Sequence, residues 1–176
     1  MKKSVIFGIC AIIVLYSSII VSILVSPWFD ITKNALSDLG NLTHNSCTIF
    51  NFGLLLSGLL TILYSITVVR FQALKTSYFL ILVGFSMQLV GLFCENYGII
   101  HFYVSILLFF LLIPASITYF IEKRCYIALL ILIEIPLWIL HFQGFLFKGA
   151  AIPEIISSIL VIPWLLKTIF ESFNST

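Results

Sequence analysis

The sequence predicts an all-α fold, a transmembrane bundle of six helices. Two observations carry this prediction: the composition and the placement of the basic residues. With 61% hydrophobic and 9% charged residues, the chain cannot form a soluble surface, because soluble domains carry about 25% charged residues. The net charge of +2 is too small to indicate nucleic-acid binding. We therefore expect a single integral membrane domain over residues 1–176, with membrane lipids as its partners and no nucleic acid.

The basic residues lie at the ends of the apolar runs and favour one side of the membrane. Seven of the nine fall on the side that is also predicted to hold both termini: Lys2, Lys3, Arg70, Lys75, Lys123, Arg124 and Lys167. Only Lys33 and Lys148 fall on the opposite side. Juxtamembrane Lys and Arg are retained on the cytoplasmic side. We therefore predict a multi-pass protein of the cell membrane with cytoplasmic N- and C-termini.

The lengths of the apolar runs place six spans, since a spanning helix needs about 20 mostly apolar residues. These spans are about 4–25, 47–69, 77–94, 99–121, 126–142 and 151–170. We interpret the first as a retained helix, because its apolar stretch exceeds the about 7–15 residues of a signal peptide. Short connections make neighbouring helices antiparallel. The one sizeable outer loop, residues 26–46, is expected to hold a short helix that Asp30 or Thr32 caps and Gly40 ends.

Small and polar residues recur along one face of the second and third spans. They are Asn51, Gly58, Thr61 and Ser65 in the second span, and Gly84, Gln88, Gly91 and Glu95 in the third. In lipid, such residues let helices approach closely and bond to one another. We interpret the glycine and serine positions of these faces as helix packing.

Glu134 is the one acid predicted to lie near the bilayer midplane. It follows Arg124 by ten residues, which corresponds to about 15 Å at the α-helical rise. An ionisable side chain at that depth is costly, so a functional role is the default hypothesis. The alternative is a protonated Glu134 that bonds to a backbone carbonyl freed by Pro136.

The remaining polar residues gather at the outer ends of the predicted helices. We expect an outward-facing pocket whose ligand-binding residues are Asp38, Asn51, Glu95, His101, His141 and Glu154. Glu134 is expected to form its deep floor or a proton site. The alternative is a set of interfacial residues that only touch water.

Catalytic and metal-binding patterns are weak. His101, His141 and one carboxylate could supply the three protein ligands of a catalytic zinc, but no HExxH or comparable pair is present. We predict no metal and no cofactor. Cys47 and Cys94 both lie at the outer side, where a disulfide between them remains open.

Four short segments of the chain resemble an uncharacterised prokaryotic membrane family, domain of unknown function 998. They are Ala35–Gly40, Phe50–Gly53, Ile100–Phe110 with His101 and Ser105, and Gly149–Glu154. The resemblance implies a six-span layout and marks Ser37–Gly40, Asn51, His101 and Glu154 as family-like positions. Such families look distantly similar to eukaryotic membrane proteins of the Frag1/DRAM/Sfk1 type, which are linked to lipid organisation and autophagy. The resemblance implies no particular activity.

The polar cluster and this resemblance favour a membrane protein that binds a lipid headgroup or a polar small molecule in an outward-facing pocket. The first alternative is a metal-dependent membrane hydrolase or lipid-modifying enzyme that uses His101 and His141. The second is a small proton-coupled transporter built on Glu134, against which the sequence shows no duplicated halves.

Overall fold

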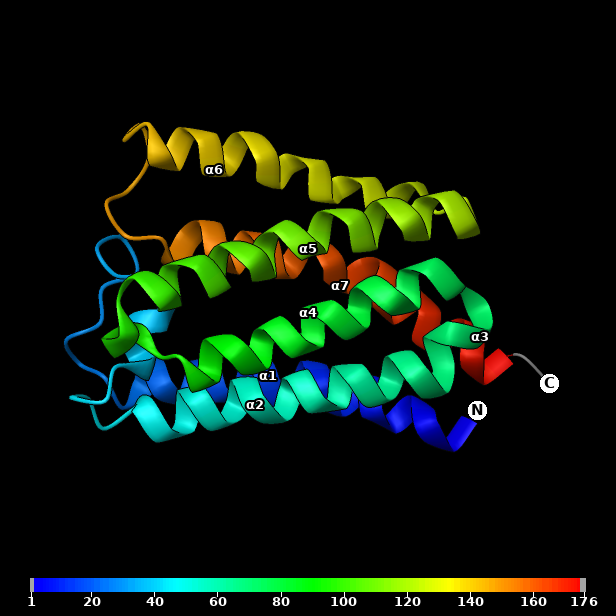
Figure 1. Cartoon of the computed structure of the whole chain (residues 1–176), viewed down its shortest axis with the longest axis horizontal. Coiled ribbons are helices and arrows are strands. Elements are labelled where there is room, and N and C mark those ends of the chain that lie inside the picture. The colour runs from blue at the N-terminus through cyan, green and yellow to red at the C-terminus, as the bar shows by residue number, and fades with distance from the viewer. Residues whose placement is uncertain (1, 175–176) are drawn as a thin grey trace.

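The computed structural model describes residues 2–174, and the side chains of residues 3–173. This part of the chain is all-helical, without a strand, as the sequence predicted (Figure 1). The long helices are α1 (Val5–Leu24), α2 (Cys47–Tyr64), α4 (Leu74–Leu92), α5 (Ile99–Lys123) and α7 (Ala151–Asn174). The shorter elements are η1 (Lys2–Ser4), η2 (Leu36–Gly40), η3 (Ser65–Val69), α3 (Arg70–Gln72), η4 (Glu95–Tyr97), η5 (Tyr126–Ile133) and α6 (Glu134–Phe142).

Five of these helices are long and apolar enough to cross a membrane: Val5–Leu24, Cys47–Gln72, Leu74–Leu92, Ile99–Lys123 and Ala151–Phe173. They match five predicted spans to within a few residues, although the third helix begins at Leu74 rather than Ser77. Large apolar side chains such as Ile13, Phe85 and Phe110 are exposed on their outer surface, which a lipid-facing surface requires. The chain is a helical, multi-pass membrane protein.

The remaining predicted span, Tyr126–Phe142, is a shorter apolar helix. The prediction of an α-helix throughout was wrong, because residues 126–133 form the 3₁₀ helix η5 and only residues 134–142 are α-helical. A 3₁₀ helix rises about 2.0 Å per residue and an α-helix about 1.5 Å. The 17 residues therefore extend over about 30 Å, which is roughly the thickness of the hydrocarbon core. The tighter winding lets a short segment cover the same height as its longer neighbours.

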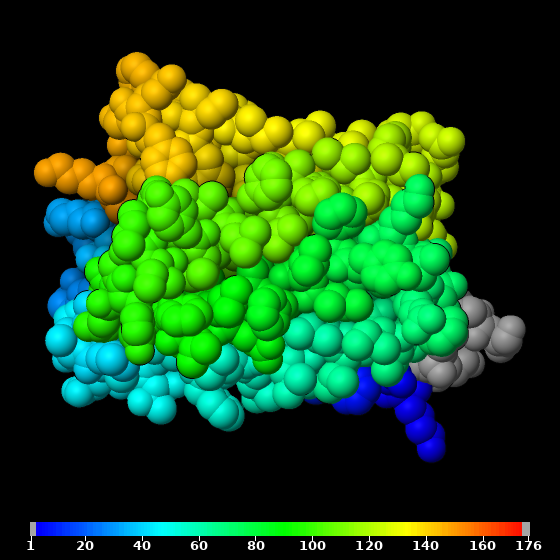
Figure 2. Space-filling view, in the orientation of Figure 1, coloured from blue at the N-terminus to red at the C-terminus, as the bar shows by residue number. Residues whose placement is uncertain are grey.

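The helices follow one another as antiparallel neighbours and close into a bundle. α2 packs between α1 and α4, and α4 packs against α5. α7 returns behind them, against α1, α5 and η5 (Figure 1). From the side shown in Figure 2, α2, α4 and α5 cover most of α1 and α7. α6 and η5 form the edge of the bundle.

The interface of α2 and α4 confirms that the small-residue faces are packing faces. A Cβ atom on Gly84 would lie 2.6 Å from the Gly58 carbonyl oxygen, and one on Gly91 would lie 2.8 Å from the Asn51 carbonyl oxygen. Gln88 adds a hydrogen bond of 3.4 Å from its Nε2 to the Leu55 carbonyl oxygen. The two backbones therefore approach closely only because these positions lack side chains.

The loop between α1 and α2 differs from its prediction. Asp30 and Thr32 do not cap a helix, since residues 30–34 form a turn in which Asp30 Oδ1 accepts hydrogen bonds from Thr32 N (2.9 Å) and Thr32 Oγ1 (2.6 Å). Only the last part of the predicted helix forms, as η2, and it ends at Gly40. We refer to the end of the bundle that carries this loop as the loop end, and to the other as the terminal end.

Candidate functional site

A long cavity runs through the centre of the bundle. It is lined by α1, α2, α4, α5 and α7, and η2 closes it at the loop end. The space inside it that the centre of a water-sized sphere can reach is about 140 Å³. α6 and η5 contribute no lining residue.

The cavity extends over most of the height of the bundle. On α2 it is lined from Phe50 to Tyr64, and on α7 from Glu154 to Ile169. These stretches of fifteen and sixteen residues of α-helix correspond to about 20 Å. That length exceeds one leaflet, which is about half of the roughly 30 Å hydrocarbon core.

The walls of the cavity are apolar, and most of their hydroxyl groups already have partners. Tyr16 Oη donates to Ser158 Oγ (3.0 Å), and Ser57 Oγ donates to the Ala11 carbonyl oxygen (2.8 Å). Thr61 Oγ1 donates to the Ser57 carbonyl oxygen (2.9 Å). Because these groups are satisfied within the protein, the middle of the cavity presents chiefly aliphatic and aromatic carbon to an occupant.

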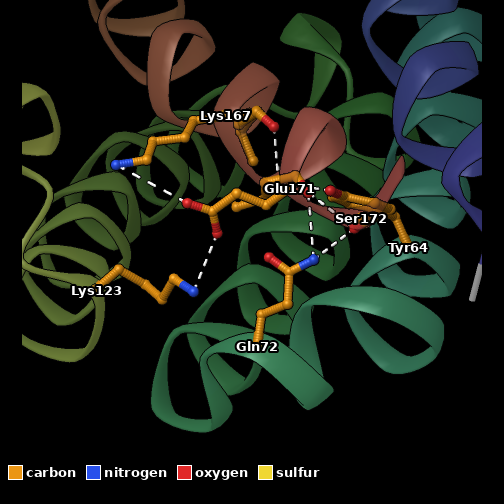
Figure 3. A network of polar contacts seen from close by, with 8 residues as sticks. Tyr64, Gln72, Lys123, Lys167, Glu171 and Ser172 are labelled. Carbon is orange, nitrogen blue, oxygen red and sulfur yellow. Dashed lines mark hydrogen bonds and ion pairs between the residues drawn. The ribbon is translucent and has the colours of Figure 1, made fainter. Parts of the chain in front are cut away.

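Polar contacts join α2, α3, α5 and α7 at the terminal end of the bundle (Figure 3). Tyr64 Oη lies 2.5 Å from Thr168 Oγ1, and Gln72 Nε2 donates to Ser172 Oγ. Nearby, the Glu171 carboxylate lies between Lys123 (3.0 Å) and Lys167 (3.9 Å). This network fixes α7 against its neighbours below the cavity.

At the loop end, η2 lies over the cavity as a lid, defined here as residues 35–40. Leu36 and Leu39 are buried beneath it. The buried Leu36 N–H donates to Glu154 Oε2 at 2.6 Å. Glu154 lies in the first turn of α7, where the helix dipole favours a negative charge. The lid is therefore held to α7 by a carboxylate that also faces the cavity.

Two other predicted site residues hold the lid in shape. Asp38 Oδ2 accepts hydrogen bonds from the Ala35 N–H and from Asn34 Nδ2, both at 3.0 Å. Asn51 Nδ2, on α2, donates to the Gly40 carbonyl oxygen at 2.9 Å. Neither Asp38 nor Asn51 lines the cavity. Their contacts fix both ends of η2.

The segment before α7 also pairs with the loop between α1 and α2. Gly149 N–H donates to the Thr32 carbonyl oxygen, and Ala151 N–H donates to the Asn34 carbonyl oxygen, both at 3.0 Å. A Cβ atom on Gly149 would overlap the backbone of Asn34. A glycine at position 149 is therefore required for the two segments to meet.

His101 lies behind the cavity wall. Its Nδ1 is 2.7 Å from the Phe93 carbonyl oxygen at the end of α4, and its Nε2 is 3.3 Å from Ser105 Oγ. Since a carbonyl oxygen only accepts hydrogen bonds, Nδ1 carries a proton. In the neutral ring Nε2 then accepts the Ser105 hydroxyl, and Ser105 lines the cavity. His101 thus joins α4 to α5 and contacts the cavity only through Ser105.

Glu95, His141 and Glu134 lie elsewhere. Glu95 Oε2 accepts a hydrogen bond from Asn41 Nδ2 (2.5 Å) in the loop between α1 and α2. His141 packs against the ring of Trp138, with centroids 5.7 Å apart, and its Nδ1 is buried without a partner. Glu134 is only 2% exposed, and its Oε2 has no hydrogen-bond partner. Neither His141 nor Glu134 lines the cavity, so Glu134 does not form its floor.

Of the seven predicted site residues, only Glu154 lines the cavity. That the others bind a ligand stays a prediction. Among residues 2–174, no three His, Cys, Asp or Glu side chains are gathered where they could hold a metal ion. The proposed set of His101, His141 and a carboxylate is therefore not assembled. Cys47 and Cys94 are free thiols.

The sequence model of a protein family extends across this whole arrangement. The family described as "Protein of unknown function (DUF998)" matches residues 9–169. The chain belongs to this family. The matched region runs from α1 to α7 and includes the lid and Glu154, which confirms the resemblance found in the sequence. No curated protein and no solved structure matches the chain, so the wider likeness to the Frag1/DRAM/Sfk1 type stays a prediction.

Sequence reasoning missed the apolar walls of the cavity in this DUF998 protein. Leu80, Val83 and Leu108 line it, yet in the sequence they cannot be distinguished from residues that pack against a neighbouring helix. The clearest sequence signal near the cavity was Glu154, because a carboxyl in the first turn of an apolar helix is unusual in a spanning segment.

Proposed function

We propose that this DUF998 protein binds the alkyl chain of a lipid inside its helix bundle. The observation that carries the proposal is the central cavity, which is about 20 Å long by the helical rise, apolar along its walls and polar at the loop end. This shape fits one extended chain whose head lies beside Glu154. The sequence predicts a site for a lipid headgroup, and we propose instead that the tail of the lipid occupies most of the site.

Water is a poor occupant of such a cavity. A buried water needs 2–4 polar partners, and most hydroxyl groups of the wall are already bonded to other protein groups. An empty cavity would forfeit the dispersion contacts of its lining atoms. An alkyl chain restores these contacts along the apolar walls.

The hydrophobic effect does not drive this binding, because a lipid tail is as apolar in the bilayer as in the cavity. The chain is held by close contact with the walls, and selectivity comes from the fit of the cavity and from the group at its loop end. We therefore expect the bound lipid to be sensitive to the volume of the lining residues.

A matched pair of substitutions on α4 tests the proposal. Val83 lines the cavity, whereas the adjacent Leu82 is 47% exposed on the outer surface. Val83→Trp places an indole in the cavity, and Leu82→Trp places the same group in the lipid phase. The proteins are purified in digitonin, which has no linear alkyl chain that could enter the cavity, and retained lipid is measured by native mass spectrometry.

We expect wild type and Leu82→Trp to retain a stoichiometric lipid and Val83→Trp to lose it at the same yield of folded protein. Should wild type carry no lipid under these conditions, or should Val83→Trp retain as much as Leu82→Trp, the cavity does not hold a lipid tail. The wild-type measurement decides even where Val83→Trp fails to fold.

We further propose that the protein lies in the cell membrane with the loop end outside. The support is the excess of Lys and Arg at the opposite end. A cysteine introduced at Leu42, which is exposed in the outer loop, should react in intact cells with a membrane-impermeant maleimide when the four native cysteines are replaced. If the cysteine reacts only after cell lysis, the loop end faces the cytoplasm and the proposed orientation is wrong.

A further inference from the structure

The charge of the cavity lining is one-sided. Among its 27 residues, Glu154 is the only acid, and no Lys, Arg or His is present. Such a lining offers nothing that could neutralise an anion. A phosphate or sulfate head at the loop end would face the Glu154 carboxyl, and the Ser37 hydroxyl, which also lines the cavity, could donate a hydrogen bond to it but could not neutralise its charge.

The Glu154 carboxyl also has unused capacity to accept hydrogen bonds. The side chain is 7% exposed, and in the described part of the chain its one hydrogen bond is the contact from Leu36 N–H to Oε2. A carboxylate has about four lone-pair sites on its two oxygens. Among the described residues no basic side chain forms an ion pair with it.

The groups next to Glu154 do not change this polarity. Asp38, on the lid, adds a second negative charge, and its Oδ2 is occupied by Ala35 N–H and Asn34 Nδ2. Ser158, one turn further along α7, already accepts the Tyr16 hydroxyl and donates to the Ile155 carbonyl oxygen. The free acceptors at the loop end of the cavity are therefore the Glu154 carboxyl and the Ser37 hydroxyl, and of these two only Glu154 is an acid.

We propose that the bound lipid has a head with a hydrogen-bond donor and no negative charge, an alcohol or an amine, and that this donor binds the Glu154 carboxyl. The inference rests on the proposed function, because it assumes that an alkyl chain occupies the cavity. It goes further by naming the class of lipid: a long-chain alcohol or amine rather than a phospholipid or another anionic amphiphile.

A series of ligands with the same tail tests the head alone. Hexadecylamine carries a charge and donors, hexadecanol a neutral donor, hexadecyltrimethylammonium a positive charge without a donor, and hexadecyl sulfate a negative charge without a donor. Each competes with deuterated hexadecanol for the protein in digitonin, and occupancy is measured by native mass spectrometry. We expect the amine and the alcohol to bind at least about tenfold more tightly than the sulfate and the trimethylammonium, as the loss of one hydrogen bond to a charged group predicts.

Comparing wild type with Glu154→Gln separates binding of a ligand to the protein from partition of that ligand into the detergent micelle, because the partition is the same in both samples. Gln keeps a carbonyl oxygen that can accept from Leu36 N–H but removes the negative charge. The amine should therefore lose about tenfold in affinity relative to wild type, and the alcohol less. The matched control is Glu122→Gln, which alters a carboxylate that accepts the N–H groups of Lys75 (2.8 Å) and Thr76 (2.9 Å) but does not line the cavity.

The outcomes distinguish the two proposals. If none of the four ligands binds wild type, the proposed function fails, and this inference fails with it. If the four bind equally well, or the sulfate binds as tightly as the alcohol, the tail site stands and the donor-head inference is overturned. An equal loss of amine affinity in Glu154→Gln and Glu122→Gln also overturns it. The wild-type series decides even where a variant does not fold.

Discussion

The hydrogen bond between the lid and α7 has a measurable energetic consequence. Leu36 N–H is buried and donates to Glu154 Oε2 at 2.6 Å. Glu154→Ala removes the acceptor and leaves this donor without a partner, while the rest of the lid keeps its bonds to Asp38 and Asn51. The substitution therefore isolates one contact between η2 and α7.

The magnitude follows from the cost of a buried, unpaired donor, which is about 1–3 kcal/mol. Local opening of the lid should become easier by that amount, so the Leu36 amide should exchange with solvent about 5- to 150-fold faster. Because Thr32 and Asn34 still accept the N–H groups of Gly149 and Ala151, the increase should be confined to residues 35–40. The helices themselves should keep their protection.

Hydrogen–deuterium exchange measured by mass spectrometry on the purified protein provides the assay. Glu95→Ala is the matched control, because Glu95 holds Asn41 in the same loop but does not touch η2 through a backbone N–H. Its effect should appear around residue 41 and spare Leu36. If hydrogen–deuterium exchange of residues 35–40 is unchanged in Glu154→Ala, or increases equally in Glu95→Ala, the hydrogen bond from Leu36 N–H to Glu154 is not the contact that holds the lid to α7.

Two further predictions concern packing and pH. Gly84→Ala places a Cβ atom 2.6 Å from the Gly58 carbonyl oxygen. The cost of overpacking, about 1–3 kcal/mol, should exceed the roughly 1 kcal/mol that alanine gains in helix propensity, so the protein should become less stable. A melting temperature in detergent equal to or above that of wild type would contradict this. At the loop end, the hydrogen bond from Lys33, with those from Thr32, holds the pKa of Asp30 well below its usual range. The stabilisation by this turn should therefore be complete above about pH 4 and be lost only as the pH falls through the lowered pKa. Lys33→Ala should raise that pKa in a carboxyl NMR titration, and an unchanged value would argue against the pair.

The fold could be predicted because its physical signals are strong. Apolar runs of about 20 residues define spans almost without regard to neighbouring sequence, and the helix bounds followed to within a few residues. The 3₁₀ winding of residues 126–133 could not be predicted in this way. Its apolar residues give the same composition in either helix, and the choice depends on the height that the segment must cover beside α5 and α7.

The site was harder to predict, because polar residues can be recognised in the sequence, whereas the residues that line an apolar cavity cannot be distinguished there from residues that pack against a helix. Asp38 and Asn51 stand out in the sequence, yet they serve to shape the lid. His101 stands out as well, and it joins two helices. Whether Val83 faces a cavity or a neighbouring helix depends on how far apart the helices lie. That distance is set by the whole bundle, and no single residue encodes it.

Glu154 connects the lid to the interior, since the same carboxyl holds Leu36 N–H and faces the cavity. A head whose donor binds Glu154 Oε1 would leave the hydrogen bond from Leu36 N–H to Oε2 intact. A head whose donor binds Oε2 would compete with Leu36 N–H for that oxygen. The proposed lipid binding would therefore be linked to lid protection through one side chain, and by reciprocity each would affect the other by the same free energy. Comparing Glu154→Gln with Glu154→Ala separates the two roles, because Gln keeps the acceptor for the lid while losing the charge for the head. The lid then stays protected in Glu154→Gln even where the preference for an amine is gone.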